Sequence, residues 1–145
     1  MFGISKAKER LELLEENFQL LKQDPLNVSL AEQTCSDAWH LADWAFDEEK
    51  ENNQSLTKEV FRTNMYNDCS EFKILHDLVN SIKHKKLSNP KVTITQTMRK
   101  AGAFSNAFSK AFDVSRLEIH FEDGKKVDLD DLVKVAIGYW KKRLK

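Results

Sequence analysis

The sequence predicts a mainly α-helical protein: a bundle of four or five helices with a small antiparallel β-hairpin or sheet inserted before the C-terminal helix. Three observations lead to this prediction. Apolar residues recur every three or four positions through residues 1–88, β-branched alternation begins after Pro90, and an Asp-Gly turn precedes a final amphipathic stretch. With 145 residues, a single domain is expected, in which the bundle comprises 1–88 and 128–145 and the β insertion spans about 91–127.

Two long helices are expected at the start of the chain. The first should end before Asp24-Pro25, because proline lacks a backbone donor and disfavours helical geometry just before itself. Its narrow apolar stripe consists of Ile4, Ala7, Leu11, Leu14, Phe18 and Leu21. The second should span about 28–50, and its broad arc of alanines and large aromatic residues predicts a central helix that packs on several sides.

Two shorter helices should follow a polar connector. One is expected over about 57–67. The next should begin at Asp68, because Asp68 and Glu71 have the spacing of a capping box. It should end near Lys85, ahead of the clear break at Ser88-Asn89-Pro90.

The pattern after residue 90 changes from helical to β. Residues 92–97 are β-branched and alternating, and a second alternating strand is built on Leu117, Ile119 and Phe121. Asp123-Gly124 favours a hairpin turn, and residues 101–110 suggest a loop packed by its aromatic side chains. The last helix should open after Asp128, where acidic residues complement its positive end.

The charge and cysteine content exclude several classes of protein. Lys plus Arg and Asp plus Glu number 23 each, which argues against a dedicated nucleic-acid or membrane-surface binder, and no DNA-binding signature is present. Cys35 and Cys69 form no CxxC motif, so a zinc ribbon is excluded and free thiols in a reducing compartment are expected. No apolar run reaches the roughly 20 residues of a membrane span. We therefore expect a cytoplasmic protein that needs no membrane and no cofactor.

The aromatic content predicts self-association. Three Trp and nine Phe in 145 residues exceed what a small core must hide. Aromatic side chains are enriched at protein interfaces, so we expect a homodimer.

The stretch from Asp77 to His84 holds the main concentration of chemically capable side chains. At about 100° per residue, Asp77, Asn80 and His84 share one helix face, nearly opposite the apolar stripe, with His76 and Lys83 at its flank. A second row lies opposite the alanine stripe of the second long helix and contains Ser36, His40, Asp43 and Asp47.

Three interpretations of these two rows remain open. Both rows could face solvent, as charged rows usually do, or they could form a buried or inter-subunit polar network. They could also form a site. A metal site would use His40, Asp43, Asp77 and His84 as ligands, but the Glu-x-x-His pair of two-helix carboxylate sites is missing, so no metal is predicted.

A metal-free site would cleave RNA. His84 would move a proton, Lys83 would stabilise the phosphorane, and Asn80 would orient phosphate or water. The predicted catalytic residues are therefore His84, Asn80, Lys83 and Asp77. On the second row, His40 and Asp43 are the predicted binding residues.

Cys69 is a further candidate. A cysteine directly after a helix cap would lie where the dipole favours thiolate. No histidine lies near Cys69 in sequence, since His76 is two turns away, so a half-buried structural thiol is the favoured interpretation. His120, on the outer face of the second strand, is expected to be a surface residue.

The segment from Cys69 to His84 resembles a motif in a group of small, uncharacterised bacterial helical proteins. Those proteins carry a cysteine at a helix start, an Asp-Leu-Ala-Asn-type step and then Lys-His. The matching residues here are Cys69, Asp77, Leu78, Asn80, Lys83 and His84. The upstream stretch 39–44 and the strand, Asp-Gly turn, strand and Trp-containing helix near the C-terminus are also similar.

The pattern of helices is more distantly similar to that of the HEPN superfamily. That resemblance implies an α-helical bundle, often dimeric, and in many members a ribonuclease of toxin–antitoxin or phage-defence systems. Asn80 and His84 match the polar residue and the histidine of the catalytic motif, whereas no arginine precedes His84 in that window. Two functions stay open. The favoured one is a non-enzymatic interaction or accessory protein of the bacterial cytoplasm with a link to mobile elements or phage defence, and the other is a metal-independent ribonuclease that would bind RNA.

Overall fold

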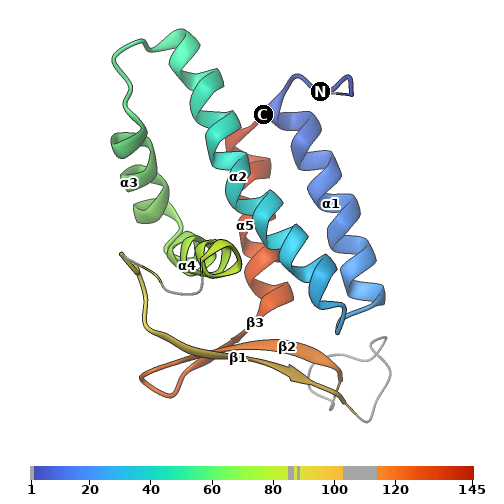
Figure 1. Ribbon diagram of the computed structural model, residues 1–145. Helices are drawn as coiled ribbons and strands as arrows, with labels where there is room; N and C mark the ends of the chain where they lie inside the picture. Colours follow the sequence, from blue (N-terminus) through green and yellow to red (C-terminus); the bar gives the residue numbers. More distant parts are fainter. Residues whose placement is uncertain (1, 85–86, 88, 103–113) are drawn as a thin grey trace.

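The computed structural model describes residues 2–84, 87, 89–102 and 114–145. The described part is mainly helical, with a small antiparallel sheet before the C-terminal helix, which confirms the predicted fold class (Figure 1). Most of the loop predicted over 101–110 lies outside the described residues. The elements are α1 (Ala7–Gln23), α2 (Val28–Asn52), α3 (Lys58–Asp68), α4 (Glu71–Lys83), β1 (Ile94–Lys100), β2 (Arg116–Phe121), β3 (Lys126–Asp128) and α5 (Leu129–Arg143).

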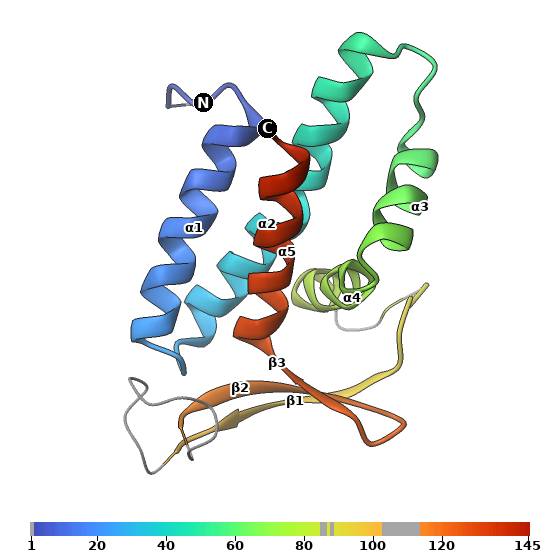
Figure 2. The same cartoon turned by 180° about the vertical axis from the view of Figure 1, so that it is seen from behind.

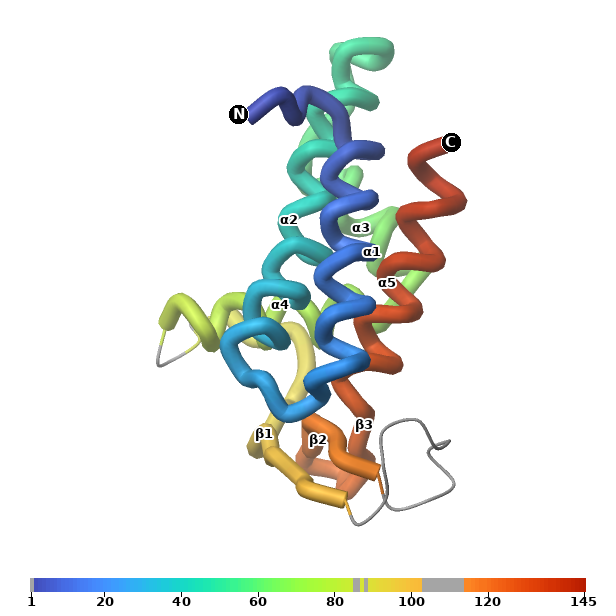
Figure 3. Tube along the Cα trace, turned by 90° about the vertical axis from the view of Figure 1, so that its right-hand side faces the viewer, coloured from blue at the N-terminus to red at the C-terminus, as the bar shows by residue number. Residues whose placement is uncertain are grey.

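Helices α1, α2 and α5 run side by side along the molecule (Figures 1 and 3). Helix α3 returns beside α2, and α4 crosses the bundle, so that Figure 1 looks almost along its axis. The sheet lies across one end of the bundle, and α5 rises directly from β3 (Figure 2). Both termini lie at the opposite end from the sheet.

Local sequence accounts for the starts of α2 and α3 and for the hairpin. The Asn27 side chain accepts a hydrogen bond from the Leu30 N–H at 3.0 Å and caps α2. Thr57 accepts from the Val60 N–H at 3.2 Å and caps α3. Gly124 has a φ of 85°, as the predicted Asp-Gly hairpin turn between β2 and β3 requires.

The predicted capping box at Asp68 is wrong. Asp68 is the last residue of α3, because the Cys69 N–H still donates to the Met65 carbonyl at 2.9 Å and continues the helical pattern. The N-cap residue of α4 is Ser70, and its side chain forms no capping bond. Helix α4 ends at Lys83, two residues earlier than expected.

The strand order is β1-β2-β3, and both pairings are antiparallel. β1 lies a few residues later than predicted, and its register shifts between Ile94 and Gln96. Its pairing with β2 includes Thr97 opposite Ile119 and Arg99 opposite Leu117. All residues of β1 except Ile94 are exposed, so β1 is an uncovered edge of the sheet.

Trp140 is the centre of the core. Its side chain is fully buried, its ring centroid lies 5.3 Å from that of Phe72, and its Nε1–H donates to the Ala38 carbonyl at 3.0 Å. Small residues on α2 allow α1 and α5 to pack close to it. The buried alanines of α2 are Ala31, Ala38, Ala42 and Ala45.

We expect Trp140→Ala to lower the free energy of unfolding by about 3–5 kcal/mol, because it leaves a large cavity and removes a buried hydrogen bond. Chemical denaturation measures this loss. Trp44→Ala is the matched control, since Trp44 is only partly buried and packs under Arg10, whose guanidinium carbon lies 4.7 Å from the ring centroid. Equal losses in the two variants would contradict the central place of Trp140.

Candidate functional site

The Asp77 carboxylate joins α4 to the segment that leads into the sheet. Its side chain is 1% exposed. It accepts hydrogen bonds from the Lys91 N–H, at 2.9 Å to each oxygen, and from the Val92 N–H at 2.8 Å. A buried carboxylate needs such partners, and here they come from the backbone.

His76 bridges Asp77 and Asn80. Its Nδ1 lies 2.8 Å from Oδ1 of Asp77, and its Nε2 lies 3.1 Å from Nδ2 of Asn80. Because the Asn80 amide nitrogen is a donor, Nε2 accepts and the proton resides on Nδ1, which donates to Asp77. From the sequence, His76 was expected only at the flank of this row, although its spacing of four from Asn80 places the two side chains on one helix face.

An aromatic and cationic layer covers this network from α2 and α3. The His76 ring meets Trp39 edge-on, with 5.3 Å between centroids, and Trp39 stacks on Tyr66 at 6.3 Å. The Arg62 guanidinium lies 5.4 Å from the Trp39 centroid. Burial raises the pKa of Tyr66, and the nearby Asp77 carboxylate adds to this rise while Arg62 opposes it.

The predicted row on α4 divides in the structure. Asp77 and Asn80 belong to the network with His76, whereas Lys83 and His84 are exposed at the end of the helix. His84 is the C-cap residue, and its N–H donates to the Asn80 carbonyl at 2.7 Å. The structure therefore brings two of the four predicted catalytic side chains into one cluster and leaves the other two in solvent.

The second row does not meet the first. Asp43 pairs with Lys58 at 3.2 Å and Arg62 at 3.6 Å, which ties α2 to α3. His40 is exposed and lines a cavity of about 370 Å³ whose other side is formed by α1. Since His40, Asp43, Asp77 and His84 lie in different surroundings, they do not form the alternative metal site.

Among the described residues, one group has the spacing of metal ligands, and sequence analysis did not single it out as such. It consists of Asp128, Asp130 and Asp131 at the start of α5. Acidic residues there complement the helix dipole, as the sequence predicts.

Neither cysteine has the character of a nucleophile. Burial raises the pKa of the Cys35 thiol to about 12. Burial, followed by the Glu71 carboxylate, raises the pKa of Cys69 to about 12, and the Cys69 Sγ–H donates to Oε2 of Glu71 at 3.4 Å. The helix N-terminus considered for Cys69 does not apply, because Cys69 is the C-cap residue of α3.

His120 belongs to a charged group on the outer sheet face and is half-buried rather than a plain surface residue. Its Nε2 lies 3.3 Å from Oε1 of Glu118, whose side chain is 3% exposed, and Lys126 Nζ lies 3.4 Å from Oε2. Burial disfavours the charged form of Glu118, but the contacts with His120 and Lys126 outweigh this effect and lower the pKa of Glu118.

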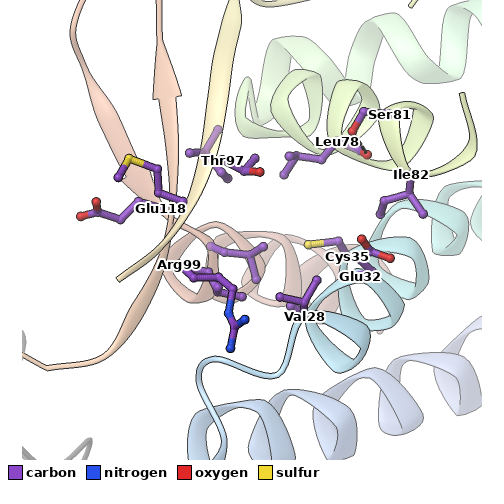
Figure 4. Close-up of a pocket in the computed structure, with 14 residues that line it drawn as sticks. Val28, Glu32, Cys35, Leu78, Ser81, Ile82, Thr97, Arg99 and Glu118 are labelled. Atoms are coloured by element: carbon purple, nitrogen blue, oxygen red, sulfur yellow. Dashed lines mark hydrogen bonds between the residues drawn. The ribbon is translucent and has the colours of Figure 1, made fainter. Parts of the chain in front are cut away.

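A cleft that sequence analysis missed separates the helices from the sheet. It encloses about 310 Å³ between the start of α2, the end of α4 and strands β1 and β2 (Figure 4). Val28, Ile82 and Met98 line it and are 40%, 42% and 41% exposed, respectively. Arg99 and Glu32 supply charges of opposite sign. Because three parts of the chain meet there, no local pattern could have indicated it.

Comparisons with protein-family models, with curated proteins and with solved structures gave no match. Within the described ranges, no helix combines the length and the apolar character needed to cross a membrane.

We expect Asp77→Ala to cost about 1–3 kcal/mol of unfolding free energy, because the Lys91 and Val92 N–H groups lose their acceptor. Denaturation measures the loss, and hydrogen exchange should accelerate at those two amides. Asp43→Ala is the matched control: its carboxylate is 41% exposed, so its ion pairs should contribute less than about 1 kcal/mol. Unchanged hydrogen exchange at the Lys91 and Val92 amides would contradict the role of Asp77 as their hydrogen-bond acceptor.

We expect both thiols to react slowly with iodoacetamide at pH 8 while the protein is folded. A pKa of about 12 against an ordinary 9 lowers the thiolate fraction by roughly three orders of magnitude. Because the folded pKa is raised, the stability from the protonated thiols is complete below about pH 9 and is lost as the pH rises towards 12. Cys35→Ala and Cys69→Ala assign the two rates, and equally fast labelling with and without denaturant would refute the expectation.

Proposed function

We propose that this chain is an interaction or accessory module of the bacterial cytoplasm, and that it recognises its partner at the cleft between α2, α4 and β1. The observation that carries this proposal is the apolar rim. Val28 and Ile82 each expose about two fifths of their surface beside one cavity of about 310 Å³. Exposed apolar groups gathered around a hollow are typical of binding surfaces.

The polar network supports a role without catalysis. Asp77, the most buried of the predicted catalytic residues, has its oxygens bonded to two backbone N–H groups and to His76. His76 is in turn bonded on both ring nitrogens. A carboxylate and an imidazole held in this way stabilise the fold and have no lone pair or proton directed at a ligand.

The cleft also has the polar groups that give a binding site direction. Arg99 stands on β1, and Glu32 stands on α2 across the opening. Ser81 adds a hydroxyl from α4, although it already donates to the Leu78 carbonyl at 2.6 Å. An apolar hollow with a few charged groups at its edge suits a partner segment with one apolar and one charged side chain.

Site-specific photocrosslinking in cells tests this proposal. A photoreactive amino acid at position 82 should trap a discrete partner, because Ile82 lines the cleft. The same amino acid at position 60 is the matched control, since Val60 is similarly exposed, at 49%, and does not line the cleft. Equal crosslinking at both positions, or none at position 82, would refute the proposal.

A metal-independent HEPN-like ribonuclease remains the second candidate. Lys83 and His84 are exposed at the end of α4, so both side chains are accessible to RNA, and Asn80 lies one turn before them. Neither side chain forms an ion pair with another residue in the part of the chain that the structure describes. In this candidate, His84 would move a proton, Lys83 would stabilise the phosphorane, and Asn80 would orient phosphate or water.

Incubation with total RNA decides between the two candidates. For an interaction module, we expect no cleavage with or without EDTA, and the same result for His84→Ala. EDTA-resistant cleavage that His84→Ala abolishes would favour the ribonuclease. His40→Ala is the matched control, because His40 is also an exposed histidine and lies on α2, away from the end of α4.

A further inference from the structure

We propose that the partner binds as an extended segment that adds a strand to β1 and seats an apolar side chain in the cleft. This inference rests on the proposed function, because it assumes that the cleft is the interaction surface. It adds the form of the partner and its chemistry: alternating apolar residues with an acidic residue that pairs with Arg99.

The first observation is the open edge. β1 spans Ile94–Lys100 and pairs on one side with β2, while its other side has no strand partner among the described residues. Helix α5 packs against β2 and β3, so the helical bundle supports the far strands of the sheet and leaves β1 uncovered. An exposed edge strand offers unpaired N–H and C=O groups to another chain.

The second observation is the direction of these backbone groups. The Phe121 N–H donates to the Lys125 carbonyl at 2.9 Å, so the backbone of Phe121 faces the hairpin partner of β2. Alternation along β2 then turns the backbone of Ile119 and Leu117 the same way, towards β3. Their partners on β1, Thr97 and Arg99, consequently direct their N–H and C=O groups to the open edge.

The third observation is that the same two residues face the cleft. Cross-strand partners lie on one face of a sheet, and Ile119, the partner of Thr97, is 1% exposed and points to the core. In Figure 4, Thr97 and Arg99 lie along the opening, while Glu118 points away from it. A strand added at this edge would therefore direct alternate side chains into the same hollow.

The added strand would also cover the exposed apolar rim. Neighbouring strands lie about 4.8 Å apart, so the new strand would extend the sheet outward under the end of α4 and the start of α2. There Ile82 and Val28 expose 42% and 40% of their surface. An apolar side chain from the partner, placed between them, would remove both from water.

Charge favours a different chain over a second copy of this one. Arg99 is exposed and forms no ion pair with any residue that the structure describes, and Lys100 follows it. β1 contains no acidic residue, so two copies paired through their β1 strands would bring none to Arg99. A partner segment with Asp or Glu at that position supplies the missing charge.

Selection from a phage-displayed library of random peptides, each about eight residues long to match a strand, tests the proposal on the full chain. We expect enriched peptides in which apolar residues alternate and an acidic residue recurs. Thr97→Pro should weaken binding of the best synthetic peptide by about tenfold or more, because it removes one N–H at the open edge. The fold should survive, since that N–H takes no part in the pairing with β2.

A matched pair of neutral variants tests the charge without the risk of misfolding. Arg99→Gln should weaken binding, whereas Lys100→Gln, whose side chain lies on the other sheet face, should leave it nearly unchanged. Bound peptide should also slow hydrogen exchange at the Thr97 and Arg99 amides, since both residues are exposed in the free protein and their N–H groups face the open edge.

The outcomes separate this inference from the proposed function. Peptides whose binding is lost in Ile82→Asp but unaffected by Thr97→Pro would overturn strand addition and leave the cleft as the binding surface. The absence of any peptide sensitive to Ile82→Asp would overturn both. Sedimentation that reveals a dimer disrupted by Thr97→Pro would overturn the separate partner and assign the edge to a second copy.

Discussion

The hydrogen bonds between the Asp77 carboxylate and the Lys91 and Val92 N–H groups join the two parts of this molecule. One part is the helical bundle, and the other is the sheet that lies across its end. Without an acceptor at this point, the segment that leads into β1 would have backbone donors directed at α4 with nothing to receive them. The anchor therefore sets where β1 begins and how far it stands from α2 and α4. His76, Asn80 and Trp39 depend on it in turn, because each contacts the next around the same carboxylate.

A cleft lies between two places where the described helices support the sheet. Asp77 holds the approach to β1, and α5 packs against β2 and β3. Between these supports, the middle of β1 is exposed. The residue of β1 opposite the buried Ile119 is Thr97, whose small side chain leaves space beside it. The cavity of about 310 Å³ occupies this space. The helices form one side of this cleft, and the edge strand β1 forms the other side with backbone groups that have no strand partner in the described residues. Such a surface suits recognition of an extended segment.

The same arrangement explains why the chemically capable residues are dispersed. His76 and Asp77 are held by each other, by Asn80 and by the backbone, and the cysteines are protonated by burial, with pKa values raised to about 12. Asp43 connects α2 to α3 through Lys58 and Arg62. Lys83 and His84 remain accessible at the end of α4, apart from the others. Each of these groups contributes separately to the stability or the charge of the protein. Catalysis requires several groups to converge on one reacting atom. This distribution is the reason why we propose binding rather than catalysis.

The sequence by itself determined the elements. The stripe of α1, the caps at Asn27 and Thr57 and the Asp123-Gly124 turn depend on residues close in the chain, and local patterns predict such features. The start of α4 could not be predicted in this way. Asp68, the residue expected to cap α4, is instead the last residue of α3. Only the tertiary structure decided the orientation of Asp77. On the isolated helix it lies opposite the apolar stripe, where charge is ordinarily solvated, and it is buried because a segment fourteen residues further on folds over it. The cleft has the same origin: Val28, Ile82 and Met98 are far apart in sequence, and long-range packing brings them together.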